Sequence, residues 1–267
     1  MTWAQVHASD GSAISPVSGR QEAESAADAR PTADVFWPAV SAIAWREVVR
    51  FLRQRNRVFA AVVTPVVFWL LLGFGLNEVA VVGVDTSAGG TGYLEYFFPG
   101  MIVMVVLFTS IFSTITVIDD RNSGFLQGVL ASPAKRGAIV GGKVLGGAAI
   151  ATLHGVVLLP IWCVFFDWSG GWPGVGGLVL ATLVMFVMAA GLTGLGLWFA
   201  WPMDSTSGYH AVMNLVQFPM WFLSGAVFPV ATAGALGYVM LANPLTYGYT
   251  AFAGALRGNL GQNGGLS

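Results

Sequence analysis

Long apolar runs dominate the hydrophobic pattern of this chain. Five of them contain no Lys, Arg, Asp or Glu, and each is long enough to cross a bilayer as a helix. They cover residues 58–76, 97–118, 144–166, 174–200 and 209–230. The pattern predicts an all-α integral membrane protein, a polytopic helical bundle with five clear spans.

Composition agrees with a membrane protein. Only 9% of the residues are charged, 55% are hydrophobic and the mean hydropathy is +0.71, whereas a soluble domain carries about 25% charged residues. The net charge of −1 argues neither for nor against nucleic acid, and we expect no nucleic-acid partner. The single cysteine, Cys163, excludes a disulfide within the chain and is expected to pack in an apolar run.

The first 37 residues differ in character, because they are rich in Ala, Ser, Asp and Glu and have no sustained apolar period. We expect residues 1–37 to form a disordered cytoplasmic tail. They lack a basic start followed by an apolar stretch, so they do not resemble a cleaved signal peptide.

The positions of the cations predict the orientation. Cations precede the first span and fill the loop 119–143, whereas the loop 77–96 holds acids and no cation. The positive-inside rule therefore places the N-terminus and the loop 119–143 in the cytoplasm, and the loops 77–96 and 167–173 outside. We expect a multi-pass protein of a bacterial cytoplasmic (inner) membrane.

Residues 38–57 are expected to form an amphipathic interfacial helix. On a helical wheel, Arg46, Arg50, Arg53 and Arg57 fall within about 60° of one another. Such a basic stripe can face the anionic head groups of membrane lipids. The alternative is that these arginines only set the topology.

The loop 119–143 is predicted to contain a short helix. Gly124 permits a turn, and an apolar face follows at helical spacing, before Ser132-Pro133 ends the helix. The face consists of Phe125, Leu126, Val129 and Leu130. A helix of this kind lies across the membrane surface and offers Phe and Leu to a partner.

The stretch 137–144, GAIVGGKV, matches seven of the eight positions of a phosphate-binding P-loop. Val144 stands where the motif needs the hydroxyl that binds magnesium. We therefore predict that the glycines and Lys143 mark a helix entering the bilayer, with Lys143 snorkelling at its boundary.

Polar residues within the spans are few. His154 and a group in the fifth span, Asn214, Gln217 and Ser224, are candidates to line a pathway, with Pro219 and Gly225 bending that helix. Hydrogen bonding between helices is the alternative role for all four. Small residues of the fourth span, Gly191, Thr193, Gly194 and Gly196, permit close helix approach.

A membrane-embedded enzyme, such as an intramembrane hydrolase, is the alternative class of function. Hydrolysis needs an activated nucleophile or a set of metal ligands. No span contains two acids, an H-E-x-x-H or a G-x-S-x-G motif. The sequence therefore favours a transport subunit over an enzyme.

Several motifs together resemble the permease subunits of type-2 ATP-binding-cassette exporters. They are Pro65 in the first span, YFFPG at 96–100, the DR-x-x-G-F-L pattern with its S-P at 120–133, GK at 142–143, MNLVQFPMWFLSGAVFPV at 213–230 and NPLTYGYTAFAGAL at 243–256. The resemblance covers about residues 38–256. Asn122 and Gln127 stand where family members often carry acids.

The resemblance implies a division of labour. Two permease copies, here expected as a homodimer, form the pathway, and two separate ATPase subunits dock beneath them and bind ATP and Mg, so this chain holds no cofactor. Residues 124–131 would match the coupling helix that inserts into the ATPase, and 38–57 the connecting helix. The substrate would be a hydrophobic or amphiphilic drug, lipid or lipid-linked glycan moved out of the cytoplasm.

The segment 231–256 supports two interpretations. Hydropathy favours a sixth span at 234–256, but Asn243-Pro244 interrupts it, and the resemblance implies an external re-entrant hairpin. We predict that the transmembrane domain covers 58–230 and that 231–267 forms an outer re-entrant segment and a C-terminal tail. Ser267 would then lie outside, and the final span of the family would be absent.

Overall fold

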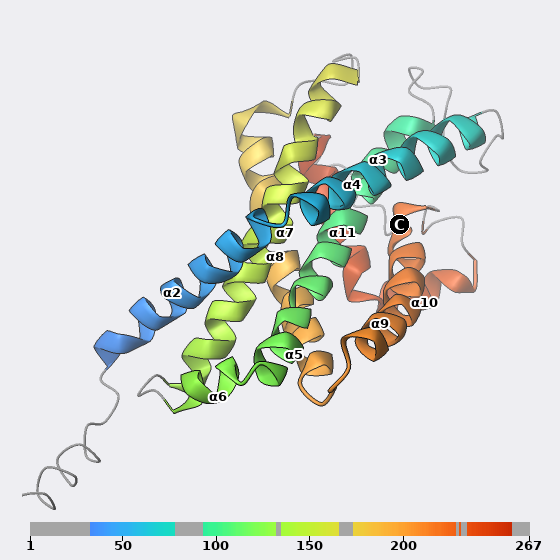
Figure 1. Cartoon of the computed structure of the whole chain (residues 1–267). Coiled ribbons are helices and arrows are strands. Elements are labelled where there is room, and N and C mark those ends of the chain that lie inside the picture. The colour runs from blue at the N-terminus through green and yellow to red at the C-terminus, as the bar shows by residue number, and fades with distance from the viewer. Residues whose placement is uncertain are drawn as a thin grey trace, which may run out of the picture.

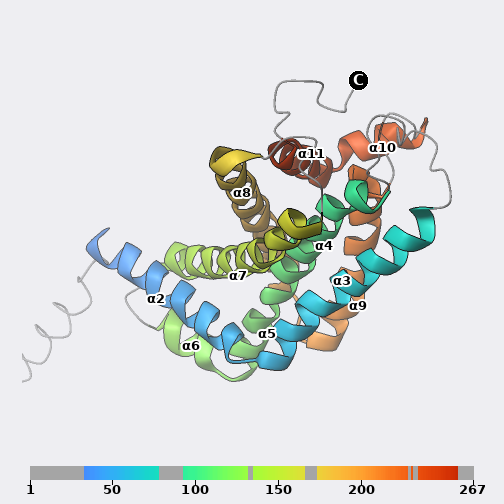
Figure 2. The ribbon, with the colours of Figure 1, turned by 90° about the horizontal axis from the view of Figure 1, so that it is seen from above.

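The computed structural model describes residues 33–77, 93–131, 135–165, 173–227, 230 and 234–257, and these fold as a bundle of helices (Figures 1 and 2). Several expectations fall outside the described residues: the tail 1–32, most of the loop 77–96, Ser132-Pro133, the turn 166–172 and the C-terminal tail with Ser267. The same applies to the side chains of Arg57, Leu130 and Cys163.

Along most of their length, the described residues form helices. They are α2 (Ala33–Leu52), α3 (Arg55–Asn77), α4 (Tyr93–Ser113), α5 (Ile115–Asn122), α6 (Phe125–Leu130), α7 (Arg136–Phe165), α8 (Gly174–Ala200), α9 (Thr206–Trp221), the π-helical turn η2 (Phe222–Ala226), α10 (Leu236–Ala242) and α11 (Pro244–Leu256). The all-α prediction is thus confirmed for the part of the chain that the structure describes.

Three predicted spans are confirmed as helices long and apolar enough to cross a bilayer. They are Glu95–Asn122, which joins α4 and α5, Arg136–Trp162 in α7, and Gly174–Ala200, which is α8. In the region of the first predicted span, the described apolar helix is the shorter Val63–Gly75, within α3.

The fifth predicted span, 209–230, is not one continuous helix. α9 ends at Trp221 and passes into η2, where Leu223 and Gly225 leave helical geometry. Gly225 has a φ of +85°, a conformation that costs a side-chain-bearing residue about 1–2 kcal/mol. The bend expected at Gly225 is therefore a full break of the helix.

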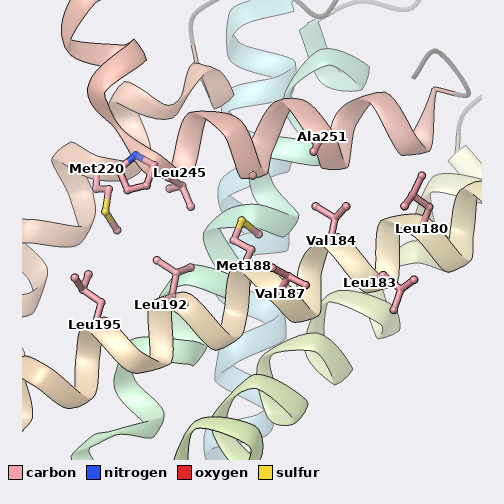
Figure 3. Close-up of a pocket in the computed structure, with 13 residues that line it drawn as sticks. Leu180, Leu183, Val184, Val187, Met188, Leu192, Leu195, Met220, Leu245 and Ala251 are labelled. Atoms are coloured by element: carbon pink, nitrogen blue, oxygen red, sulfur yellow. The ribbon is translucent and has the colours of Figure 1, made fainter. Parts of the chain in front are cut away.

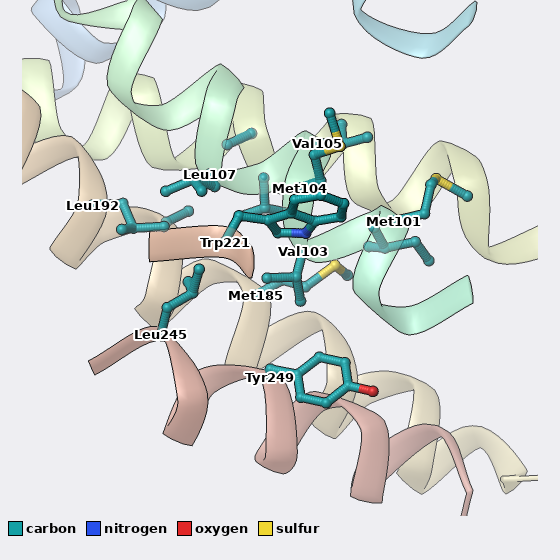
Figure 4. Packing of buried hydrophobic residues seen from close by; sticks show 14 of the residues in the cluster. Met101, Val103, Met104, Val105, Leu107, Met185, Leu192, Trp221, Leu245 and Tyr249 are labelled. Atoms are coloured by element: carbon teal, nitrogen blue, oxygen red, sulfur yellow. The ribbon is translucent and has the colours of Figure 1, made fainter. Parts of the chain in front are cut away.

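Helix α4 occupies the centre of the bundle. It packs against α3, α7, α8 and α9, and its residues from Phe97 to Leu107 are all buried. Trp221 of α9 lies against this helix and donates a hydrogen bond from Nε1 to the Gly100 carbonyl at 2.9 Å (Figure 4). By contrast, α8 exposes one apolar face along its length, as a lipid-facing helix does.

Helix α2 lies against α7 (Figures 1 and 2). Their backbones approach closely because α7 presents glycines to α2: a Cβ on Gly142 would come within 2.7 Å of Ile43, and one on Gly146 within 2.9 Å of Glu47. The interfacial helix was predicted to continue to residue 57, but it ends at Leu52. The residues 53–57, RQRNR, offer no apolar side chain to bury against the bundle.

The segment 234–256 forms two short helices that meet at Asn243, and not one continuous helix. Asn243 has an extended backbone, caps α11 by accepting a hydrogen bond from Leu245 N–H, and donates one to the Met220 carbonyl at 2.6 Å. A crevice of about 650 Å³, lined by aliphatic side chains, separates α11 from α8 (Figure 3).

Candidate functional site

The corner between α5 and α6 positions a short helix at one end of the bundle, here called the α6 end (Figure 1). Gly124 makes the corner with a φ of +75°, which confirms that this glycine supplies the turn. The Phe125 side chain is 43% exposed, whereas Leu126 is 7% exposed and faces the bundle. The predicted apolar face is therefore divided, and Phe125 is the most exposed of those of its side chains that the structure describes.

A buried ion-pair cluster lies directly behind this corner. The Lys143 ammonium donates to Glu47 Oε1 at 2.9 Å, to Asp120 Oδ2 at 2.5 Å and to Thr116 Oγ1 at 3.1 Å. All three charged side chains are at most 6% exposed. The prediction that Lys143 snorkels at the membrane boundary is wrong, because its charge is neutralised inside the protein by acids of α2 and α5.

Two arginines of α2 complete this charge cluster. Arg46 and Arg50 donate to Asp120 Oδ1 at 2.8 and 3.1 Å. The Arg46 guanidinium also lies 3.9 Å from the centre of the Phe125 ring, within cation–π range. One side chain of α2 therefore touches both the buried acid and the exposed aromatic residue of α6.

The basic stripe predicted for residues 38–57 is not formed on one helix. Arg46 and Arg50 turn toward Asp120, Arg53 lies in the turn after α2, and Arg57 belongs to α3. Arg46 and Arg50 are paired with the buried Asp120 carboxylate, and the helix that carries them ends before Arg53. On α2 the most exposed large apolar side chains are two tryptophans, Trp37 at 69% and Trp45 at 70%.

Arg121 ties the other side of α5 to the connection between α8 and α9. Its guanidinium donates to the Trp201 carbonyl at 2.8 Å and to the Met203 carbonyl, and it pairs with Asp204 at 2.9 Å. Neighbouring residues at the end of α5 thus contact different parts of the bundle: Asp120 contacts the helices α2 and α7, and Arg121 contacts the connection between α8 and α9.

The P-loop-like stretch 137–144 forms the first two turns of α7. In a helix the N–H groups beyond the first four residues are bonded to preceding carbonyls, so they cannot wrap a phosphate. Gly142 serves the close contact with α2 and Lys143 serves the ion-pair cluster. Gly142 and Lys143 therefore have structural roles in the packing of α2 on α7.

The other candidate residues lie apart from the α6 end. His154 is buried, with its ring 5.1 Å from that of Phe51. Asn214 is exposed, and Ser224 is buried and donates to the Trp221 carbonyl at 2.6 Å. Gln217 is fully buried, and neither polar atom of its amide has a hydrogen-bond partner among the described residues. The structure does not gather these four residues into one site.

The small residues of α8 have different environments. Cβ atoms placed on Gly191 and Gly194 would meet nothing within 4 Å, whereas one on Gly196 would meet the Thr114 hydroxyl at 3.0 Å and the Tyr209 hydroxyl at 3.1 Å. Close approach is therefore needed at Gly196. At Gly191 and Gly194 the described residues show no such need.

Sequence reasoning missed Glu47 and Asp120 as partners of Lys143. Both carried a usable signal, because an acid inside a basic interfacial helix and an acid at the end of an apolar span each need a cation nearby. Tyr209 was missed as well: its hydroxyl lies 2.7 Å from the Thr114 hydroxyl and donates to carbonyls of α4 and α8. A tyrosine at the start of a span shows no pattern that identifies such partners.

The family of the chain follows from comparison with known proteins. A family model described as ABC-2 type transporter matches residues 38–256. The chain is 24% identical over 250 residues to the "Daunorubicin resistance ABC transporter permease protein DrrB1" of Streptomyces coeruleorubidus, which covers 92% of this chain and 84% of that protein. It is 24% identical over 204 residues to the "Putative transport permease ycf38" of Cyanophora paradoxa, covering 76% and 68% of the two chains.

A third relative is "Nodulation protein J" of Rhizobium leguminosarum bv. viciae, 28% identical over 208 residues, which cover 75% of this chain and 73% of that protein. The resemblance drawn from the sequence motifs is confirmed, because the family model matches most of the chain. The chain belongs to the ABC-2 type transporter family.

Proposed function

We propose that this chain is the transmembrane permease subunit of an ATP-binding-cassette exporter and that a separate ATPase subunit docks at its α6 end. The observation that carries the proposal is α6 itself, a short helix at a corner of the bundle with an exposed Phe125. An exposed aromatic side chain beside a cation is a typical anchor for a partner pocket. ATP and Mg would bind to the ATPase, with two ATPase copies serving two permease copies.

The contacts of α6 and α5 with the rest of the bundle would transmit a conformational change of the ATPase to the permease. A displacement of Phe125 would reach α2 through Arg46, α7 through Asp120 and the connection before α9 through Arg121. In this proposal the α6 end faces the cytoplasm, as the cations of the loop 119–143 favour. Trp37 and Trp45 on the outer side of α2 would then anchor this helix in the interface with the membrane lipids.

The proposal includes a re-entrant C-terminal segment. Tyr96 of α4 donates to the Gly225 carbonyl at 2.7 Å, and the Arg257 guanidinium lies 5.9 Å from the centre of the same ring. Gly225 and Arg257, at the two ends of the segment 225–257, thus both meet α4 at Tyr96, while Asn243 between them contacts Met220. We infer that the segment dips into the outer half of the membrane and returns.

The substrate class rests on the relatives. One relative is named for resistance to a drug and another for nodulation. We propose a hydrophobic or amphiphilic substrate that leaves the cytoplasm through a homodimer of this chain. The bacterial cytoplasmic membrane, with the N-terminus inside, is the location that fits this direction.

The test is the docking of the ATPase. Phe125→Asp places a charge at the proposed contact and should weaken association by about 2 kcal/mol or more, roughly thirtyfold in Kd. Gln127→Asp is the matched control, because Gln127 is exposed on the same helix and the acid is tolerated by water. Leu126 is unsuitable for this test, since its side chain is buried and its replacement would report on folding.

Co-purification of the ATPase, measured together with membrane insertion of the permease, gives the readout. We expect Phe125→Asp to insert normally and lose the ATPase, and Gln127→Asp to keep it. Undiminished capture of the ATPase by the Phe125→Asp variant would refute the assignment of α6.

A further inference from the structure

A groove between α7 and α8 opens on the surface of the bundle near the α6 end, where α7 begins and α8 ends (Figure 1). We propose that it binds one phospholipid with an acidic head group, with an acyl chain in the groove and the head group against the start of α7. The groove has a volume of about 630 Å³, within the range of small-molecule sites, about 300–1,000 Å³. The inference goes beyond the proposed function, because this site requires neither a transported substrate nor an ATPase.

A single stripe along the end of α8 forms most of the apolar wall. Its members follow the i, i+3, i+4, i+7 spacing of one helix face, and all of them line the groove: Gly194, Leu197, Trp198 and Trp201. Val140 of α7 lines the opposite side. Trp198 is 71% exposed and Trp201 is 50% exposed, so the described part of the chain leaves this end of the groove uncovered.

Gly194 leaves space in the wall of the groove. A Cβ atom at this position would meet nothing within 4 Å, so no packing contact with a described residue requires a glycine here. Gly196 on the same helix differs, because a Cβ there would meet the hydroxyl groups of Thr114 and Tyr209. An unbranched acyl chain can enter the depression at Gly194 and gain packing contacts that a filled helix surface does not offer.

Two cations stand at the start of α7, where the head group would lie. Lys135 and Arg136 are both exposed, and neither forms an ion pair with a described residue. Arg136 lies four positions before Val140, and residues at this spacing share one helix face, so Arg136 lies on the side of α7 that lines the groove. Side chains on a helix lean toward its N-terminus, which directs this guanidinium outward, beyond the apolar wall.

The positive charge at the start of α7 is not balanced by the exposed acids of the neighbouring segments. Asp204 pairs with Arg121 at 2.9 Å. Asp119 pairs with Arg50 at 3.7 Å. The described residues that line the groove include no Asp or Glu. The free cations therefore complement an acidic head group, and exposed tryptophans beside them are typical of the boundary between head groups and acyl chains.

The experiment measures lipid binding by native mass spectrometry on the full chain in detergent. The probes are phosphatidylglycerol and phosphatidylcholine with identical acyl chains. We expect one phosphatidylglycerol to be retained per chain, with an affinity for this lipid that falls about fivefold in each of Lys135→Gln and Arg136→Gln. Arg136→Lys keeps the charge and should retain the lipid. Arg53→Gln is the matched control, because it removes an exposed arginine from the turn after α2, outside the groove.

A second pair of variants tests the apolar wall. Gly194→Leu fills the groove without a clash at the Cβ position, and it should reduce the affinity for phosphatidylglycerol by roughly three- to tenfold. Gly191→Leu is the matched control, because Gly191 also has nothing within 4 Å of its Cβ position but lines the crevice between α8 and α11. This control should bind phosphatidylglycerol as the unmodified chain does.

Three results would overturn the inference: equal retention of the two lipids, binding unaffected by both glutamine variants, or equal effects of Gly194→Leu and Gly191→Leu. Displacement of the lipid by inorganic phosphate at the same concentration would indicate a site for a bare anion and would also overturn it. So would a Gly194→Leu variant that loses a chain dimer and keeps the lipid, because the groove would then belong to a second copy. No ATPase takes part in these measurements, so a failure of docking affects the proposed function alone.

Discussion

Replacing Lys143 by methionine tests the buried cluster most directly. Met has a similar length and no charge, so the change removes three hydrogen bonds with little loss of packing. Asp120 keeps Arg46 at 2.8 Å and Arg50 at 3.1 Å. Glu47, which is 5% exposed, retains only a long contact with Arg46 at 3.4 Å. The substitution therefore leaves one buried carboxylate nearly unpaired.

The expected loss of stability follows from the number of partners that each carboxylate keeps. Breaking a buried ion pair by removing one partner costs about 3–5 kcal/mol, and we expect the lower end because Asp120 remains paired. For a chain of this size, about 3 kcal/mol corresponds to a fall of roughly 6–12 °C in apparent melting temperature. The measurement is thermal unfolding in detergent or nanodiscs, followed by the loss of a monodisperse elution peak.

A second variant separates charge from packing. Lys143→Met combined with Glu47→Leu removes both members of the pair and should recover at least half of the loss, because apolar replacement of a buried ion pair is often neutral or stabilising. A melting temperature unchanged by Lys143→Met would refute the reasoning. So would a double variant whose loss equals the sum of the two single losses.

Three further outcomes follow from the packing of the bundle. Gly142→Ala should lower the apparent melting temperature by several degrees, because the new methyl group meets Ile43 at 2.7 Å. Gly191→Ala is the control and should not lower it, because nothing lies within 4 Å of the new methyl group; equal effects of the two variants would contradict the close contact of α2 and α7. Tyr209→Phe should lower the free energy of unfolding by about 1–2 kcal/mol, because it removes the hydroxyl that contacts Thr114 and the backbone of α4 and α8. The same unfolding assay measures this, and an unchanged stability would show that the hydroxyl does not stabilise the bundle. Gln217→Leu should leave thermal stability unchanged or raise it, since the buried amide has no hydrogen-bond partner among the described residues; clear destabilisation would show that the amide holds the bundle together. If Gln217 lines the pathway, the same variant should lower substrate-stimulated ATP hydrolysis.

The sequence predicted well those features that depend on local pattern. Uncharged apolar runs predicted three helices that can cross a bilayer, and Gly124 predicted the corner before α6. Asn243-Pro244 indicated the interruption of the last apolar run, and the structure places the junction of two helices there. These features follow from hydropathy and backbone conformation, which neighbouring residues determine.

Features that depend on distant partners were predicted poorly. A cation at the membrane boundary of a span is typical of snorkelling, but Lys143 is 96 positions from Glu47 and still bonds to it. Likewise, the even spacing of arginines before the first span suggested a lipid-facing stripe, since nothing local shows that Asp120 lies beside them. The sequence shows which charged groups need a partner of opposite charge. Which partner each group pairs with is determined by the packing of α2 on α7.

The distribution of these charges fixes the short helix α6 and the end of α5 to particular neighbours in the bundle. Apolar side chains of similar volume would hold α2, α5 and α7 together about as strongly as the ion pairs do. Hydrogen bonds between charges differ in being directional, so Asp120 and Arg121 fix the end of α5 to two specific neighbours. Asp120 accepts hydrogen bonds from Arg46 and Arg50 of α2, and Arg121 donates to the connection before α9. If an ATPase docks at Phe125 as proposed, a displacement of α6 would therefore be transmitted to α2 and to the connection before α9.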